Sequence, residues 1–240
     1  MKIALLGYGK MGKEIEKIAI EKNHDIVLII DIDNQQDLTI ENLKKADVAI
    51  DFSIPGSAYK NILLCFKAGV PVVSGTTGWL DKFDDISRIC AEENQTFFYA
   101  SNYSIGVNIF FHLNKYLAGM MNNFENYDVK MEEIHHTQKL DAPSGTAITL
   151  ANDIIGVLNR KTKWKLNTAN DKEAIAIKAV REGTVPGTHI INYDSDIDSI
   201  EIKHTAKSRR GFAYGAVLAA EFIQNKKGQY SMDDLLKLEK

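Results

Sequence analysis

Ile3-Ala-Leu-Leu-Gly-Tyr-Gly-Lys-Met-Gly12 is the stretch that decides the fold of the first part of the chain. Its four leading residues are apolar and predict a short buried strand, and the apolar residues of 15–19 recur at helical spacing. A G-x-G-x-x-G pattern between a strand and a helix is typical of dinucleotide-binding folds. Gly7 permits the tight turn, Gly9 lets the backbone approach a pyrophosphate, and Gly12 lets the helix pack closely on the strand. We therefore expect a dinucleotide cofactor to bind at Gly7, Tyr8, Gly9, Lys10, Met11 and Gly12.

The second predicted strand, Asp25–Asp31, ends in a carboxylate at about the expected separation from the glycines. Asp31 can accept hydrogen bonds from a ribose diol and would repel a 2′-phosphate at the same place. Ile32 follows it, where an NADP site would favour a basic residue. These residues favour NADH, with NADPH as the alternative. The competing interpretation is that Asp31 only caps a turn with Asp33 and Asn34.

Strands and helices alternate as far as Ala100, which predicts βαβ units and a parallel sheet. Ligands bind such sheets at the carboxyl ends of the strands. Small and hydroxyl residues follow two of these ends and suit the nicotinamide side of a cofactor, although they are also ordinary turn residues. The strands are expected at 46–51, 70–73 and 96–100, with helices at 57–68 and 81–94. The candidate cofactor residues are Gly75, Thr76, Thr77, Ala100, Ser101, Asn102 and Tyr103.

The pattern changes after Tyr103, where a long apolar helix is followed by several strands with one helix among them. This texture is typical of α+β domains and places a domain boundary near Tyr103. The expected elements are helices at 105–121, about 145–158, 212–224 and 231–237, strands at 127–134, 174–182, 188–193 and 197–204, a polar surface loop at 159–172, and a hairpin-like turn at 181–187.

Glu133–Thr146 collects two imidazoles, an ammonium group and a small-residue turn on a loop between a predicted strand and a predicted helix. Catalytic groups concentrate on loops that rigid elements hold. Each of these residues alone is more often structural, but together and beside the cofactor pattern they indicate a functional site. His135 and His136 are adjacent at a strand end and point to opposite faces, so we expect no metal site there.

Composition excludes several other classes of function. The 240 residues carry a net charge of −3, so no general basic field attracts nucleic acid or an anionic membrane. The dense basic patch at Lys203–Arg210 is either a solvated loop or a local anion site. Cys65 and Cys90 show no metal-ligand spacing and are interpreted as packing thiols, which favours a reducing cytoplasm. No apolar run is long enough to cross a bilayer, and Met1–Leu6 is too short for a signal peptide.

These motifs together resemble the 4-hydroxy-tetrahydrodipicolinate reductase (dihydrodipicolinate reductase) family over nearly the whole chain. The block H-H-x-x-K-x-D-A-P-S-G-T is the most specific of them. One departure is a glycine loop one residue tighter than in many members, with Lys10 where Arg is often found. The resemblance rests on Gly7–Gly12, Asp51–Ser53, Gly75–Gly78, Asn102–Asn108, Glu133–Thr146, Arg181–Gly187 and His204–Arg209.

The resemblance implies an α/β enzyme with a Rossmann-type domain at residues 1–103 plus 214–240 and an α+β substrate and tetramerisation domain at 104–213. It implies reduction of a cyclic dicarboxylate in diaminopimelate and lysine biosynthesis by a homotetramer. His135 matches the acid–base histidine and Lys139 the proton-donating lysine, and which of them gives the proton directly stays open. Substrate contacts are expected from His136, Ser144, Gly145 and Thr146.

Two other functions remain as alternatives. Another two-domain nicotinamide dehydrogenase would share the glycine loop but would not require the His-His-Lys block. A non-catalytic dinucleotide sensor should lack the proton donors, and both His135 and Lys139 are present. For an enzyme, we expect the two domains to close on the substrate, with hinges near Tyr103–Ser104 and around Phe212.

Overall fold

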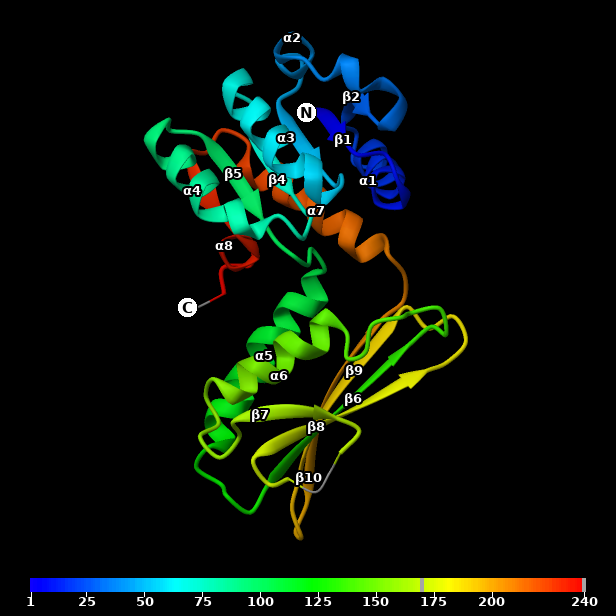
Figure 1. Ribbon diagram of the computed structural model, residues 1–240, viewed down its shortest axis with the longest axis vertical. Helices are drawn as coiled ribbons and strands as arrows, with labels where there is room; N and C mark the ends of the chain where they lie inside the picture. Colours follow the sequence, from blue (N-terminus) through cyan, green and yellow to red (C-terminus); the bar gives the residue numbers. More distant parts are fainter. Residues whose placement is uncertain (169–170, 239–240) are drawn as a thin grey trace. The chain divides into compact units, whose positions relative to one another are not determined.

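The computed structural model describes residues 1–168 and 171–238 and divides into two compact units. The first unit comprises Met1–Ile105 and Arg209–Lys240, and the second comprises Gly106–Ser208 (Figure 1). The chain thus leaves the first unit once and returns to it for its last helices.

The first unit contains a six-stranded parallel sheet in the order β11-β5-β4-β3-β1-β2, which confirms the predicted α/β class. One strand of this sheet, β11, was not predicted, because its three residues contain no apolar run. The segment is a strand because it pairs with β5. The strands are β1 (Lys2–Leu6), β2 (Asp25–Ile30), β3 (Val48–Asp51), β4 (Val72–Ser74), β5 (Thr96–Tyr99) and β11 (Gly228–Tyr230).

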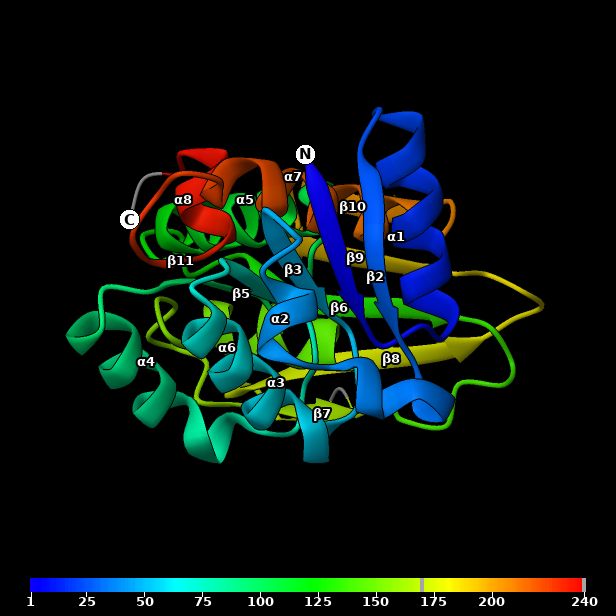
Figure 2. The ribbon, with the colours of Figure 1, turned by 90° about the horizontal axis from the view of Figure 1, so that it is seen from above.

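Helices cover both faces of this sheet, as Figure 2 shows. Alternate residues of β1 enter different cores: Ile3 and Leu5 pack with α1 and α7, whereas Ala4 and Leu6 pack with α3. This is why the strand is apolar throughout. The helices on the first face are α1 (Lys10–Glu21), α7 (Arg210–Ile223) and α8 (Met232–Leu236); those on the second are α2 (Ile40–Leu43), α3 (Pro55–Ala68) and α4 (Phe83–Glu92), and η1 (Ile32–Asp37) and η2 (Leu80–Lys82) are short 3₁₀ turns.

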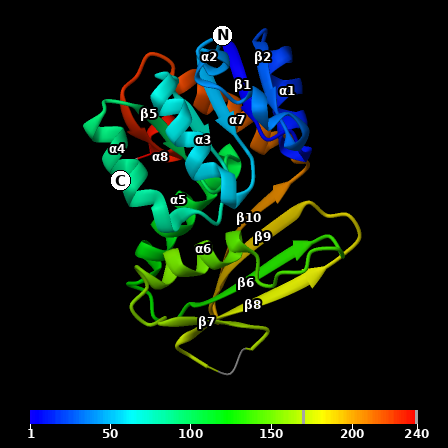
Figure 3. The ribbon, with the colours of Figure 1, turned by 45° about the horizontal axis from the view of Figure 1, so that its top comes forward.

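The second unit contains a five-stranded mixed sheet in the order β10-β9-β6-β8-β7, with α5 and α6 packed along one face (Figure 3). Residues of β6 alternate, so that Val129 and Met131 face these helices. The elements are α5 (Ile105–Met121), β6 (Asp128–His135), α6 (Gly145–Ile155), β7 (Lys163–Leu166), β8 (Ala174–Arg181), β9 (Gly187–Asp194) and β10 (Ser199–Ala206).

Two predictions for this unit were wrong. The polar loop expected at 159–172 contains β7, whose Trp164 packs on the core while its neighbours are charged; residues 169–170 lie outside the described part. The segment 181–187 is not a hairpin turn, because β6 lies between β8 and β9. It crosses the end of β6 instead, where the Glu182 amide donates to the His135 carbonyl at 2.8 Å. The end of β8 and the start of β9 therefore lie on opposite sides of His135.

Candidate functional site

The glycine loop of the first unit has the three properties that its pattern predicts. Gly7 has φ +95°, a conformation that favours glycine. A Cβ at Gly12 would lie 2.3 Å from the Gly7 carbonyl oxygen, so helix α1 can approach the loop only without a side chain there. A Cβ at Gly9, the N-cap of α1, would meet no atom within 4 Å. The helix N-terminus is therefore open to an anion at Gly9.

The other residues of this loop are placed differently. Lys10 is exposed in the first turn of α1, while Met11 is partly buried against the hydrophobic core. The Tyr8 hydroxyl donates to the Glu16 carboxylate. The Lys10 side chain is thus accessible from solvent, whereas Met11 serves packing.

Asp31 caps a turn in this structure. Its Oδ1 accepts from the Ile32 amide at 2.9 Å, and the Asn34 side chain accepts from the Asp31 amide at 2.7 Å. The capping interpretation weighed for this residue therefore describes its local geometry. A carboxylate with two oxygens can cap a turn and accept from a ribose as well, so the ribose role stays a prediction.

A buried carboxylate that was not among the candidate site residues lies at the end of β3. Asp51 is fully buried, and its oxygens accept from Asn61 Nδ2, Ser53 Oγ, Ser74 Oγ and Thr76 Oγ1 at 2.7 to 3.1 Å. Burial raises the pKa of Asp51, and these hydrogen bonds oppose that change. Thr76 Oγ1 also accepts from the Ser53 amide at 2.9 Å. Thr76 thus holds two loops together at the carboxyl end of the sheet.

Among the remaining candidates, Tyr103 belongs to the core of the first unit. Its ring lies beside Phe52 and Phe98, and its hydroxyl donates to the Ser74 carbonyl at 2.8 Å. A Cβ at Gly75 would lie 2.3 Å from the Phe52 ring, so a side chain there would displace that ring. The other candidates are Thr77 and Ser101, both exposed, Asn102, half-buried, and Ala100, buried.

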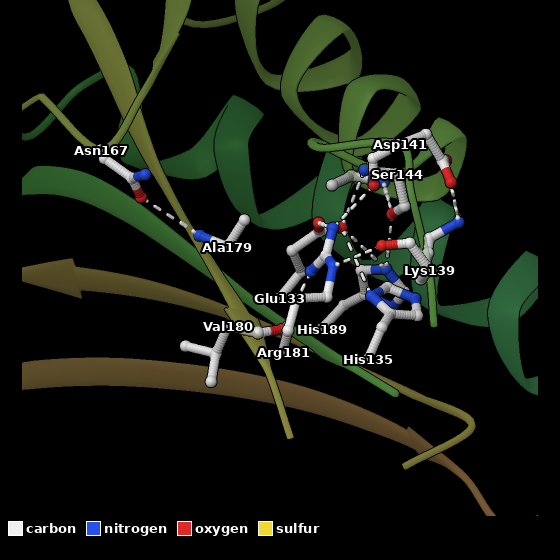
Figure 4. A network of polar contacts seen from close by, with 11 residues as sticks. Glu133, His135, Lys139, Asp141, Ser144, Asn167, Ala179, Val180, Arg181 and His189 are labelled. Atoms are coloured by element: carbon white, nitrogen blue, oxygen red, sulfur yellow. Dashed lines mark hydrogen bonds and ion pairs between the residues drawn. The ribbon is translucent and has the colours of Figure 1, made fainter. Parts of the chain in front are cut away.

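The second unit brings together polar residues that are distant in sequence (Figure 4). Glu133 and His135 lie on the same face of β6 as the core residues Val129 and Met131. In the sheet register His189 of β9 is opposite Glu133, and Arg181 of β8 is opposite His135. The sequence stretch 133–146 therefore supplies only part of the site, and neighbouring strands supply the rest.

Glu133 is the centre of this cluster and is fully buried. Its Oε2 accepts from the Ser144 amide at 2.9 Å, and its Oε1 accepts from Arg181 Nη2 at 3.0 Å. Burial alone would raise the pKa of Glu133, but the hydrogen bonds from Ser144 and Arg181 outweigh it and hold this pKa below its ordinary value. Glu133 is therefore an ionised carboxylate inside the protein.

Two imidazoles face this carboxylate. His135 Nδ1 lies 3.7 Å and His189 Nε2 4.0 Å from Glu133 Oε2. Burial lowers the pKa of His135, which Glu133 offsets only in part, and burial together with His135 lowers the pKa of His189 to about 4. The Nδ1 atoms of both rings are buried without a hydrogen-bond partner among the described residues. Both histidines are therefore neutral at pH 7.

Lys139 lies on the loop that leaves β6. Its Nζ contacts both carboxylate oxygens of Asp141 at 2.8 Å, and this hydrogen bond lowers the pKa of Asp141. Arg181 ties the same loop down, because Nη2 donates to the Asp141 carbonyl at 2.7 Å and Nε to the Lys139 carbonyl at 3.3 Å. An ammonium group is thus held on a fixed loop beside a buried imidazole.

The N-terminus of α6 completes the cluster. Ser144 is its N-cap and accepts from the Ala147 amide, while His189 Nε2 lies 3.2 Å from Ser144 Oγ. This leaves the Gly145 and Thr146 amides at the positive end of the helix. A Cβ at Gly145 would meet no atom within 4 Å, so a ligand can approach the backbone. His136 is half-buried at the start of the loop.

Glu133, His135 and His189 offer ligand atoms within 4.8 Å of one another, a spacing that a metal ion could use. The sequence argument against a metal considered His135 and His136 and did not foresee His189. However, both Glu133 oxygens already accept hydrogen bonds, one of them from the Arg181 guanidinium. A cation would have to displace this charge, so the cluster suits acid–base chemistry better than metal binding.

Other predicted features have structural roles. Arg210 of the basic patch pairs with Glu21, and the His204 ring lies beside Phe110. Cys65 and Cys90 are buried free thiols, which confirms the packing interpretation. Within residues 1–168 and 171–238, no helix is long and apolar enough to cross a membrane.

The first unit has a doubly wound parallel sheet with an open glycine loop after its first strand, as dinucleotide-dependent enzymes do, and the second adds acid–base groups beside a helix N-terminus that suits an anion. This combination defines a two-domain nicotinamide-dependent oxidoreductase. Family models described as the N-terminus and the C-terminus of dihydrodipicolinate reductase match residues 1–103 and 106–236. The chain belongs to the dihydrodipicolinate reductase family, as its motifs predicted.

Two relatives agree with this assignment, and a solved structure agrees with the fold. A 4-hydroxy-tetrahydrodipicolinate reductase of Christiangramia forsetii is 55% identical over 237 residues, covering 98% of each chain. One of Staphylococcus aureus is 36% identical over 250 residues, covering 98% of this chain and 100% of the relative. The fold is similar to that of a dipicolinate-bound dihydrodipicolinate reductase from Paenisporosarcina sp. TG-14, with TM-score 0.78, 24% identity and 98% coverage of both chains.

Proposed function

We propose that this chain reduces 4-hydroxy-tetrahydrodipicolinate to tetrahydrodipicolinate with NAD(P)H, in the biosynthesis of diaminopimelate and lysine. The observation that carries the proposal is the loop from His135 to Thr146. It combines an ammonium group, a buried imidazole and an open helix N-terminus in one cluster. The nicotinamide supplies the hydride when it is bound.

The substrate is a cyclic dicarboxylate, and its negative charge must be neutralised. We assign one carboxylate to the amides of Gly145 and Thr146, where backbone donors and the helix dipole favour an anion. His136 and Ser144 line the same turn and are assigned as further substrate contacts. The Paenisporosarcina reductase of similar fold is bound to dipicolinate, which supports a dicarboxylate ligand for this chain.

Hydride addition to the conjugated ring requires one proton. The Lys139 ammonium group forms an ion pair with Asp141 at 2.8 Å, which holds Nζ on the loop as a group that can donate a proton. Burial favours the neutral imidazole of His135, which has no acidic proton to give to the substrate at neutral pH. We therefore assign Lys139 as the direct donor and His135 as the group that assists it.

NADH is proposed as the preferred cofactor because Asp31 would repel a 2′-phosphate. The dinucleotide contacts proposed are the loop Gly7–Gly12 and the residues after β4 and β5, with Tyr103 acting through its backbone because its ring lies in the core. A cytoplasmic homotetramer remains our expectation from the family resemblance.

Substitution of the proposed donor tests this assignment. Lys139→Ala should lower kcat for 4-hydroxy-tetrahydrodipicolinate by about 10² to 10⁴, the usual contribution of general acid–base catalysis. It should leave NADH binding unchanged and weaken inhibition by dipicolinate. Lys165→Ala, which removes an exposed lysine of β7 that pairs with Asp171, is the matched control and should retain full activity. Equal activity of the two variants would contradict the role of Lys139.

A further inference from the structure

Glu133 has no contact with solvent, yet it joins three parts of the cluster around Lys139. We infer that Glu133 is a positioning residue of the reaction, which fixes the carboxylate-binding turn at Ser144 and provides the counter-charge for His135. The inference rests on the proposed function, because it assigns a role within the same site. A charged group that only stabilised the fold would not need to face a buried imidazole.

The first part held by Glu133 is the helix N-terminus. The Ser144 amide donates to Oε2 at 2.9 Å, directly before the Gly145 and Thr146 amides that are assigned to the substrate. Ser144 Oγ caps the Ala147 amide, so the carboxylate and the hydroxyl together fix the first turn of α6. Movement of Glu133 would therefore misplace the anion site.

The second part is the loop that carries Lys139. Arg181 donates to Glu133 Oε1 at 3.0 Å and to the carbonyls of Lys139 and Asp141. The pairing with Glu133 orients this guanidinium, and the guanidinium then holds the loop. One carboxylate thus sets both the anion site and, through Arg181, the path of the chain around Lys139.

The third part is His135, whose Nδ1 faces Glu133 at 3.7 Å and is buried without a partner among the described residues. An imidazolium formed there during turnover would have Glu133 as its nearest counter-charge. The ring lies against the backbone of Gly187, where a Cβ would stand 3.1 Å from His135 Nε2. The geometry therefore prepares His135 to take up a proton when the reaction requires it.

The charges around His135 come from every neighbouring element. Glu133 and Asp141 are negative, and Arg181 of β8 and Lys139 of the loop are positive, while His189 of β9 is neutral. Of the two negative groups only Glu133 is buried, where charge interactions are least screened. Without it the positive groups would predominate, and His135 would become harder to protonate.

The test is Glu133→Gln, which keeps the shape of the side chain and one oxygen acceptor but removes the charge. Glu132→Gln is the matched control, because Glu132 is the preceding residue of the same strand, points to the opposite face and pairs with exposed Lys178. The His135 ring is followed by NMR as a function of pH without substrate, together with kcat, KM and dipicolinate inhibition. NADH binding serves as a check that the first unit is intact.

In Glu133→Gln we expect the midpoint of the His135 titration to fall by about one pH unit or more, and kcat/KM to fall at least about tenfold with weaker dipicolinate inhibition. Glu132→Gln should match wild type in all of these. If the Gln variant does not fold, Glu133→Asp keeps the charge at a greater distance and should lower the midpoint less. An unchanged His135 titration with normal dipicolinate inhibition would overturn the inference. Absence of turnover in wild type would instead overturn the proposed function.

Discussion

Gly9 and Gly12 are both part of the glycine loop, but the structure assigns them different physical roles. A methyl group at Gly9 would meet no protein atom within 4 Å, whereas one at Gly12 would lie 2.3 Å from the Gly7 carbonyl oxygen. The backbone of Gly9 is extended, with φ −73° and ψ −156°, which alanine also adopts. Substitution by alanine at the two positions should therefore separate cofactor binding from folding.

For Gly9→Ala we expect little change in stability. The loss of a good N-cap residue and the reduced entropy of the unfolded chain are each below about 1 kcal/mol and opposite in sign. The added methyl group stands where a pyrophosphate would approach, so the Kd for NADH should rise at least about tenfold, or about 1.4 kcal/mol. For Gly12→Ala the steric conflict should cost about 1 to 3 kcal/mol of unfolding free energy.

The assay is thermal unfolding of each variant together with NADH titration by fluorescence. In a protein of this size, 1 kcal/mol corresponds to a shift in Tm of about 2 to 4 °C, so the loss in Gly12→Ala is measurable. Normal NADH affinity in a folded Gly9→Ala protein would refute the assignment of this loop to the pyrophosphate. A Gly12→Ala protein as stable as wild type would refute the packing argument.

Two further predictions concern buried polar groups. Burial holds the pKa of His189 at about 4, below the value of 6.5 of an exposed histidine. Between these two pH values the unfolded chain binds one more proton than the folded chain. The free energy of unfolding therefore falls as the pH is lowered through this range. His189→Gln should therefore reduce the slope of unfolding free energy against pH by about 1.4 kcal/mol per pH unit near pH 5, measured by urea unfolding, and an unchanged slope would contradict a neutral buried His189. Thr76→Val removes a donor to Asp51 and the acceptor of the Ser53 amide, and should lower the free energy of unfolding by about 1 to 3 kcal/mol. Thr77→Val at the exposed neighbouring residue is the control and should change this free energy little. Equal stabilities of the two variants would show that the Asp51 cluster does not hold these loops.

The features that sequence reasoning predicted well are those that short-range patterns determine. The glycine loop, the alternating strands and helices of the first unit and the helix after Ser144 all follow from local residue types. The pairing of Glu133 with His135 could also have been inferred, because residues two apart on a strand share a face. The last helix, expected at 231–237, begins with another local pattern, in which Asp234 accepts from the Ser231 amide three residues before it.

The features that were missed depend on contacts between distant segments. His189 and Arg181 join the site only because β9 and β8 flank β6, and no local pattern gives that strand order. Tyr103 follows a strand end, as a ligand contact would, yet its ring faces inward because Phe52 and Phe98 pack around it. The hydrogen bonds of the buried Asp51 carboxyl group could not be predicted either, since their donors come from three different parts of the chain.

The central claim is that the chain reduces 4-hydroxy-tetrahydrodipicolinate with a nicotinamide cofactor. The most direct measurement is the oxidation of NADH and, separately, NADPH by the wild-type protein at neutral pH, with freshly generated substrate. We predict rapid oxidation that requires the substrate, with a higher kcat/KM for NADH. Tight NADH binding without substrate-dependent oxidation would contradict the claim and would favour a non-catalytic dinucleotide sensor.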